Sequence, residues 1–427
     1  MSLTKEKIRA YTDILKEELI PAMGCTEPIA ISFASSIISH ALGGYPTKVR
    51  VGLSGNIIKN VKSVIVPSTG GMHGINSAVC AGIICGRPDM KLQVLSIITP
   101  DQVAEIRDYQ SKCSMEIYEL EDSRPFEIII EGELDKNIAF VHLSKRHTNI
   151  EKVRINGKDI TSNYYSPEDV VEKESTDRSL LNVEDIIKFA ETIDLEELTP
   201  LIENQISFNM AIANEGISRD WGASIGRTLY LNSNGETRVL ARALSSAGSD
   251  ARMNGCELPV YIISGSGNQG ITATVPICVY AKELGSTKEE LYRAIIISDL
   301  ITIHQKTGIG CLSAYCGAIS AGAGAGCGIC YLYGGRFYEI AHTLVNTVAI
   351  LSGTICDGAK SSCAAKIAMA VEAGIMGYDM AKSGHQFYSG EGIVTKGVEN
   401  TITNVGRLAS VGMSSTDKEI IKIMLGK

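Results

Sequence analysis

The stretch GIGCLSAYCGAISAGAGAGCGICYLYGG (residues 308–335) carries no charged side chain and decides how the chain can fold. It is long enough to cross a membrane, but it consists mainly of Gly, Ala, Ser and Cys and is only weakly hydrophobic on an insertion scale. Residues this small let neighbouring backbones approach closely. We therefore predict a buried pair of helices with small-residue contacts at the centre of the protein; a membrane protein that uses this stretch is the alternative.

Apolar residues recur with the period of an α-helix on both sides of this stretch, and strand patterns are absent beyond about Val170. Helical patterns cover residues 183–193, 195–216, 288–304, 339–353 and 366–377. The N-terminus adds an amphipathic helix over residues 5–19, which Pro21 ends, and a second helix that runs from Thr26, the expected N-cap, to about Leu42.

Residues 47–160 have a different character, because alternating or β-branched segments are interleaved with two helical patterns. The expected strands are residues 48–53, 91–98, 114–120, 126–132, 137–143 and 152–157, and the expected helices are residues 74–84 and 100–110. We therefore predict an α+β protein. Residues 1–45 and 173–427 form its mainly helical domain, and residues 46–172 form an inserted α/β domain.

The composition limits the classes of protein that are possible. With 427 residues, 44% of them hydrophobic, the chain can bury the cores of two or three domains. The net charge of -8 argues against a nucleic-acid-binding protein, whose surface would be basic. The N-terminal residues MSLTKEKIRA contain no apolar signal segment, so we expect a cytoplasmic protein without a membrane partner. The sequence does not determine the oligomeric state, and a homodimer is compatible with it.

Twelve cysteines in a long chain without a signal segment do not indicate a disulfide framework, and seven of them lie between Cys278 and Cys363. Thiols at this density are metal ligands, catalytic groups or small core residues. Cys356 and Cys363, in CDGAKSSC, are separated by six residues at a junction between a loop and a helix. Both can therefore face one metal or cluster, and packing in an Ala-rich core is an equal alternative.

Cys316, in SAYCGA, lies forty residues earlier, with Cys311, Cys327 and Cys330 as neighbours. Cys327 and Cys330 form a C-x-x-C motif, but a zinc ribbon needs two such motifs and this chain has one. Zinc is therefore weakly supported. An iron–sulfur cluster held by widely separated cysteines is compatible with the preference of such clusters for thiolates.

Cys25 is placed at the N-terminus of the second predicted helix. The helix dipole favours a thiolate there and lowers the pKa of the thiol. This position predicts a nucleophile, a base or a ligand, with a buried thiol at a turn as the alternative.

Two glycine-rich loops precede helical patterns. The loop SGSGNQGI (residues 264–271) offers Asn268 and Gln269, and backbone N–H groups that can bind an anion such as a carboxylate. The loop STGGMHGIN (residues 68–76) offers Ser68, Thr69 and Gly70, together with His73. Neither loop has the lysine of a phosphate-binding loop, so nucleotide binding is unsupported. Each loop can equally be a tight turn.

Four motifs, in this order, resemble the L-cysteine desulfidases, which are related to the alpha-chain part of the iron–sulfur L-serine dehydratases. The motifs are PAMGCTEPIA (residues 21–30), GSGNQG (265–270), SAYCGA (313–318) and CDGAKSSCAAK (356–366). The resemblance extends over nearly the whole chain and implies that the helical domain is an iron–sulfur catalytic domain.

The resemblance also implies a set of site residues. Cys316, Cys356 and Cys363 match the three ligands of a 4Fe–4S cluster that leaves one iron open. Cys25 matches the family's active cysteine, which serves as the base or as a fourth, displaceable ligand. The remaining cysteines around Cys316 fall outside the ligand pattern, and we treat them as packing residues.

The implied reaction is β-elimination of sulfide from L-cysteine, a small amino-acid substrate. The open iron acts as a Lewis acid on the substrate thiolate, and a base, preferably Cys25, removes the α-proton. The loops that carry Ser68, Thr69, Gly70, Asn268 and Gln269 hold the carboxylate, and the products are pyruvate, ammonia and hydrogen sulfide.

The serine dehydratases carry a Ser-Ser-His-Thr-type loop where this chain has STGGMHG (residues 68–74), a departure that weakens the case for serine. An L-serine dehydratase and a non-enzymatic iron–sulfur sensor are the alternatives.

Overall fold

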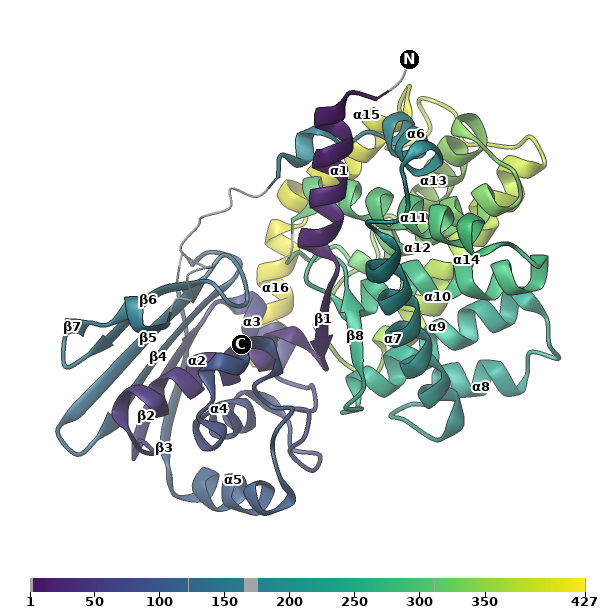
Figure 1. Cartoon of the computed structure of the whole chain (residues 1–427). Helices are drawn as coiled ribbons and strands as arrows, with labels where there is room; N and C mark the ends of the chain where they lie inside the picture. Colours follow the sequence, from purple (N-terminus) through teal and green to yellow (C-terminus); the bar gives the residue numbers. More distant parts are fainter. Residues whose placement is uncertain (1–2, 122, 165–175, 311, 427) are drawn as a thin grey trace.

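The computed structural model describes residues 3–121, 123–164, 176–310 and 312–426. Within these residues the chain is mainly helical and has one six-stranded mixed sheet, which confirms the predicted α+β class. Figure 1 shows a larger helical part beside a smaller part in which helices pack on the sheet.

The helical part combines the first helix of the chain with most of its C-terminal half. Its helices are α1 (Lys5–Glu18), α6 (Val183–Thr192), α7 (Thr199–Ser218), α8 (Ile225–Leu231), α9 (Thr237–Met253), α10 (Gly267–Leu284), α11 (Lys288–Ile309), α12 (Gly317–Leu332), α13 (Phe337–Leu351), α14 (Cys363–Lys382) and α15 (Val398–Arg407). Two short strands, β1 (Ile20–Met23) and β8 (Pro259–Ile262), pair antiparallel and connect the N-terminal segment to this part.

Within the uncharged stretch, residues 308 and 309 end α11 and Gly317–Leu332 form α12, which lies at the centre of the helical part. It packs against α10, α11, α13 and α14. A Cβ atom at Gly322 would lie 2.3 Å from the carbonyl oxygen of Ala370 in α14, and one at Gly326 would lie 2.5 Å from that of Gly374. These glycines therefore permit the close contact between α12 and α14, as the small-residue pattern predicts.

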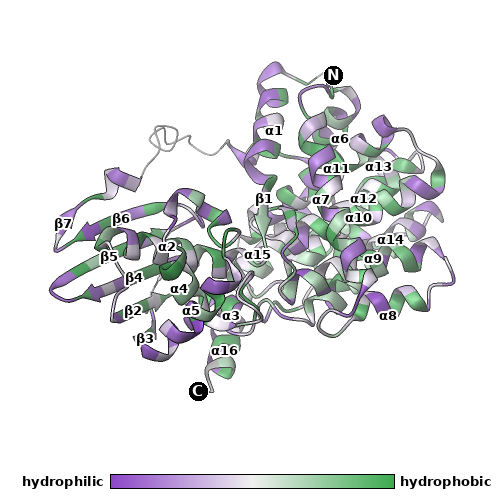
Figure 2. Ribbon diagram, turned by 60° about the horizontal axis from the view of Figure 1, so that its bottom comes forward, coloured by the Kyte–Doolittle hydropathy of each residue, from purple (hydrophilic) through white to green (hydrophobic). Residues whose placement is uncertain are grey.

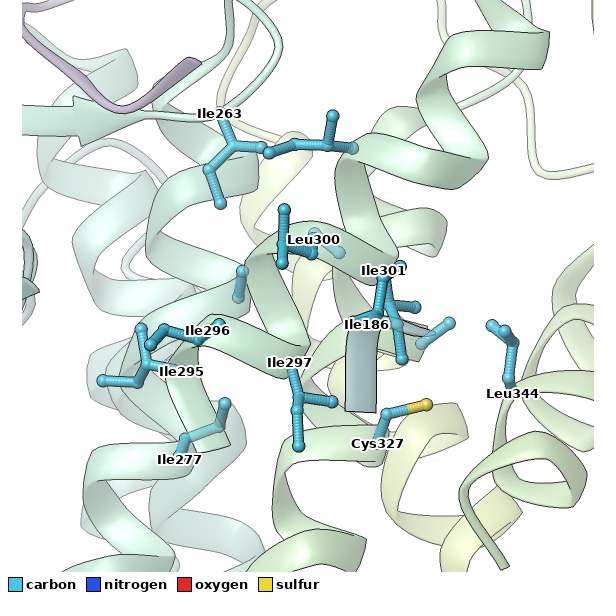
Figure 3. Close-up of a cluster of buried hydrophobic side chains, with 14 of the residues drawn as sticks. Ile186, Ile263, Ile277, Ile295, Ile296, Ile297, Leu300, Ile301, Cys327 and Leu344 are labelled. Carbon is cyan, nitrogen blue, oxygen red and sulfur yellow. The ribbon is translucent and has the colours of Figure 1, made fainter. Parts of the chain in front are cut away.

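The helical core is mainly aliphatic. Figure 3 shows Cys327 of α12 among Ile297 and Ile301 of α11 and Leu344 of α13, all of them buried. Cys330 is also fully buried, whereas Cys311 lies outside the described residues. In the part of the chain that the structure describes, no helix combines the length and apolar character that spanning a membrane requires.

The smaller part is a sheet covered by helices. The strands are β2 (Lys48–Leu53), β3 (Ser114–Glu119), β4 (Glu127–Leu134), β5 (Asn137–Ser144), β6 (Ile150–Ile155) and β7 (Lys158–Asp159), in the spatial order β3-β2-β4-β5-β6-β7. Only β2 and β3 pair parallel. The associated helices are α2 (Thr26–Leu42), α3 (Gly55–Val61), α4 (Gly74–Cys85) and α5 (Pro100–Lys112).

Helix α2 belongs to the core of this smaller part. Figure 2 shows α2 mainly hydrophobic, in contrast to the hydrophilic α1. A Cβ atom at Gly82 of α4 would lie 2.1 Å from the backbone oxygen of Ser32, so the two helices touch through their backbones. The domain boundary near residue 46 stays a prediction, but the α2 residues that it assigns to the helical domain pack with the sheet.

The strand predicted over residues 91–98 is wrong. Pro88–Gln93 form a 3-10 helix, and turns follow. Val94 and Leu95 are fully buried in the core beneath α2. A short apolar run indicates burial but does not distinguish a strand from an irregular buried segment.

The C-terminal helix α16 (Ser414–Leu425) returns to the smaller part and packs against α3, as Figure 1 shows. Lys59 of α3, only 1% exposed, pairs with Asp417 of α16 at 2.5 Å. Its Nζ also lies 3.5 Å from the carbonyl oxygen of Ser313, in the segment that leads into α12. This buried ion pair links both parts next to the N-terminus of α12.

We predict that Asp417→Ala lowers the free energy of unfolding by about 3 kcal/mol, because it leaves the buried Lys59 ammonium without its carboxylate. Urea unfolding followed by circular dichroism measures this loss. The control is Asp108→Ala, which breaks the exposed pair with Lys112 and should change the stability by less than about 0.5 kcal/mol. Equal effects of the two substitutions would contradict the importance of the buried pair.

Candidate active site

A cavity of about 490 Å³ is lined by residues of both parts of the fold. Six of the predicted site residues line it, namely Cys25, Asn268, Gln269, Cys316, Cys356 and Cys363. They come from four segments that are far apart in the sequence. The structure therefore brings together the cysteines and the GSGNQG loop, although the sequence offers no distance between them.

Cys316 and Cys363 meet because α12 and α14 run parallel. Gly322 contacts Ala370, and Gly326 contacts Gly374 four residues further along both helices. The two helices therefore run in the same direction with a fixed alignment. Cys316 is the N-cap of α12, and Cys363 is the first residue of α14. Both thiols consequently lie at the same end of the helix pair.

Cys356 is brought to Cys316 by a short antiparallel bridge between Tyr315 and Ile355. The N–H of Cys356 donates to the carbonyl oxygen of Ala314 at 2.6 Å, and the N–H of Cys316 donates to that of Thr354 at 3.0 Å. In an extended segment, the residues before and after a bridged residue point to the face opposite to that residue, and this holds for both paired segments. The thiols of Cys316 and Cys356 therefore point to the same side.

These three thiols have the donor chemistry of an iron–sulfur site. Burial, with the neighbouring Cys356 as a second cause, raises the pKa of Cys316 to about 12, and burial also raises the pKa of Cys363. Cys316 and Cys363 therefore become thiolates only beside a positive centre such as a metal. In the described ranges no group of three or more His, Cys, Asp or Glu side chains could hold a single metal ion.

Cys25 approaches the cavity from the smaller part, at the start of α2. Cys25 itself, rather than Thr26, is the N-cap of this helix, so that prediction is wrong by one residue. The thiol donates to Oε2 of Glu27 at 3.1 Å, and Asn60 donates to the other carboxylate oxygen at 2.9 Å. The Thr26 hydroxyl donates to the carbonyl oxygen of Gly265 at 2.9 Å and ties α2 to the GSGNQG loop.

The predicted thiolate at Cys25 is not favoured by these surroundings. Burial raises the pKa of Cys25 well above its ordinary value, the negative charge of Glu27 raises it further, and Arg252 opposes both. Burial also acts to raise the pKa of Glu27, but His147, the hydrogen bond from Cys25 and Arg252 lower it overall. The pair is therefore a neutral thiol donating to a carboxylate, because the helix dipole does not offset burial and a neighbouring anion.

Glu27, His147 and Arg252 are cavity residues that sequence reasoning missed as functional. Glu27 stands two residues after Cys25, and this proximity was a usable signal. His147, between β5 and β6, and Arg252, at the end of α9, carry no motif and reach the cavity only through the tertiary fold. Three buried polar atoms of lining residues have no hydrogen-bond partner among the described residues, namely His147 Nε2, Arg252 Nε and Gln269 Oε1.

The second glycine-rich loop does not reach the cavity. Ser68, Thr69 and Gly70 are absent from its lining. The Thr69 hydroxyl donates to the carbonyl oxygen of Val66 at 2.7 Å, and Arg107 donates to that of Gly70 at 2.9 Å. These contacts are those of a tight turn, so the geometry gives no support to substrate binding by this loop.

This chain is similar to a known protein family and to several bacterial proteins. The family model described as the serine dehydratase alpha chain matches residues 89–422. A UPF0597 protein of Desulfitobacterium hafniense is 49% identical over 98% of this chain and 97% of its own length. UPF0597 proteins of Treponema denticola and Aeromonas salmonicida are 41% and 36% identical, with at least 96% of each chain covered.

A free cysteine has a pKa of about 8.5. We predict that the pH at which Cys25 reaches half of its maximal reactivity toward iodoacetamide is higher than this value, because burial and the Glu27 carboxylate oppose ionisation of the thiol. Glu27→Gln removes the carboxylate charge and should lower this midpoint. Mass spectrometry of the Cys25 peptide measures both profiles, and Glu131→Gln, at an exposed position, is the control. A wild-type midpoint below that of a free cysteine would contradict the thiol assignment.

Proposed function

Because this chain belongs to the serine dehydratase alpha chain family, we propose that it is a lyase that eliminates sulfide from L-cysteine to give pyruvate, ammonia and hydrogen sulfide. Family membership supports the elimination chemistry, and L-cysteine as the substrate is the finer part of the proposal. The observation that carries it is the single cavity shared by Cys25 and the three cysteines Cys316, Cys356 and Cys363.

Cys316, Cys356 and Cys363 would hold a 4Fe–4S cluster. When bound, the cluster supplies Lewis-acid assistance to the departing heteroatom of the substrate. The chain itself positions the substrate between this wall of the cavity and Cys25. The cavity is large enough for a small amino acid and closes around it with residues from both parts.

The α-proton must pass to a group of the protein. Cys25 accepts it only as a thiolate, and the Glu27 carboxylate, 3.1 Å away, is the acceptor within reach of the thiol proton. Because burial and Glu27 raise the pKa of Cys25, this transfer requires added positive charge at the cavity that lowers that pKa. Loss of the α-proton and of sulfide leaves aminoacrylate, which tautomerises and takes up water to give pyruvate and ammonia. Asn60 holds Glu27 in place for this transfer through its hydrogen bond to Oε1.

The preference for cysteine over serine rests on sequence motifs. The chain departs from the Ser-Ser-His-Thr-type loop of the serine dehydratases, because it has STGGMHG at residues 68–74. It also carries the four motifs that resemble the cysteine desulfidases. L-serine is the second candidate substrate, since the matching family model is that of the serine dehydratase alpha chain.

The test is an anaerobic preparation whose iron, acid-labile sulfide and turnover are measured with L-cysteine and L-serine. We expect pyruvate and sulfide from L-cysteine. Cys356→Ser combined with Cys363→Ser should lose iron and activity, whereas Cys330→Ala, in the buried core, should keep both. Cys25→Ala should keep iron and lose about 10²–10⁴ in rate.

Each other outcome has a definite meaning. Full iron and activity in the double variant would refute the ligand assignment. Turnover of L-serine without L-cysteine would make the protein a serine dehydratase, and a loaded cluster without turnover of either would favour the sensor. Loss of iron in Cys25→Ala would make Cys25 a ligand.

A further inference from the structure

Arg252 is a buried cation that the elimination steps described above do not use. It is 3% exposed, lies near the end of α9 and lines the cavity. Its Nη1 donates to Oδ1 of Asn268 at 3.2 Å, and its Nε has no hydrogen-bond partner. No carboxylate of the described residues forms an ion pair with Arg252. By contrast, the cavity cations Lys59 and Arg178 both pair with carboxylates. A buried guanidinium without an anion is costly unless a ligand supplies one.

The backbone around Arg252 leaves space for it. A Cβ atom at Gly267 would lie 2.4 Å from Nε of Arg252 and 2.5 Å from Cγ2 of Val260, so a side chain there would crowd both the guanidinium and the valine. Gly267 is the first residue of α10, and no side chain caps this helix at Ser266. The first N–H groups of a helix have no partner within the helix and attract an anion. A cation and a helix N-terminus therefore meet at one point of the cavity wall.

Gln269 completes this wall. It is 4% exposed, and its Oε1 has no hydrogen-bond partner. A Cβ atom at Gly317 would lie 2.8 Å from its amide, so a second glycine makes room for a side chain of the wall. The amide acceptor is suited to a donor such as an ammonium, and the guanidinium and helix N–H groups are suited to an anion.

The anion that fits is a carboxylate beside Cys25. Arg252 is close enough for its charge to act on both Cys25 and Glu27. Guanidinium groups bind carboxylates through two parallel hydrogen bonds, and Nε with Nη2 forms one such edge. A carboxylate held there would lie in the same cavity as the Cys25 thiol.

We propose that Arg252 binds the α-carboxylate of the substrate together with the N-terminal N–H groups of α10, and that Gly267 is required to admit the guanidinium. The site accordingly selects α-amino acids over amines and amides that lack the carboxylate. Naming the ligand as the amino-acid substrate rests on the proposed function, whereas carboxylate binding at Arg252 does not.

The test is calorimetric binding of L-alanine, which has no leaving group, and of L-alaninamide, which has no carboxylate. We expect wild-type protein to bind L-alanine at least tenfold more tightly than L-alaninamide, as charge-assisted hydrogen bonds require. Arg252→Met should weaken L-alanine binding at least tenfold and remove this discrimination. Gly267→Ala, which keeps the arginine but displaces it, should do the same.

The matched control is Arg242→Met on the same helix. Arg242 pairs with Glu372 outside the cavity, so its loss should leave L-alanine binding unchanged. Melting temperatures of all three variants check that they fold, and Gly267→Ala tests the proposal without removing a buried charge.

The proposal would be overturned if folded Arg252→Met bound L-alanine as tightly as the wild type, or if Arg242→Met lost as much affinity as Arg252→Met. It would also be overturned if the wild-type protein did not bind L-alanine, or bound L-alaninamide equally tightly. A different result would refute the lyase proposal. Discriminating binding of L-alanine without release of sulfide from L-cysteine would leave the carboxylate site standing and refute the substrate.

Discussion

The close parallel contact between α12 and α14 is the constraint on which the site depends. Gly322 and Gly326 allow the backbones of the two helices to touch, and any larger residue would separate them. This contact fixes the register of the two helices. It thereby sets the N-cap Cys316 beside the first residue of α14, Cys363, with the bridge at Tyr315 bringing Cys356 to the same face.

The cavity exists only because the smaller part closes against this end of the helix pair. Helix α2 has its body in the core of the sheet part and its first residues, Cys25 to Glu27, at the cavity. The buried pair of Lys59 and Asp417 holds α3 and the C-terminal helix together next to the segment that enters α12. Two folding units with separate cores thus share one site.

Burial raises the pKa of the thiols Cys25, Cys316 and Cys363 in this site. Thiols that would ionise at an exposed helix N-terminus stay protonated here, because the low-dielectric surroundings disfavour the charged form. The neutral Cys25 thiol donates a hydrogen bond to the Glu27 carboxylate, which Asn60 and nearby positive charge stabilise. Arg252 provides positive charge on the same side of the cavity without an ion-pair partner in the described residues.

Sequence alone determined the elements whose signal is local. The helical period on both sides of residues 308–335 and the alternation in residues 114–157 predicted the α+β class, and the small residues of the uncharged stretch predicted its burial. The cysteine motifs and the GSGNQG loop identified six residues that line one cavity. These patterns are properties of neighbouring residues, so they can be found without knowledge of the fold.

The tertiary structure decided what depends on burial and on contacts between distant segments. The apolar run at residues 91–98 became a 3-10 helix followed by turns, in which Val94 and Leu95 are buried and Ile97 is exposed. The loop at Ser68 became a turn outside the cavity. The pKa of Cys25 moved opposite to the prediction, because Glu27 and burial outweigh the helix dipole. His147 and Arg252 entered the site without any motif. The physical reason is that proximity across more than a hundred residues, and the dielectric around a side chain, are set by how the two cores pack and not by the residues beside it in the chain.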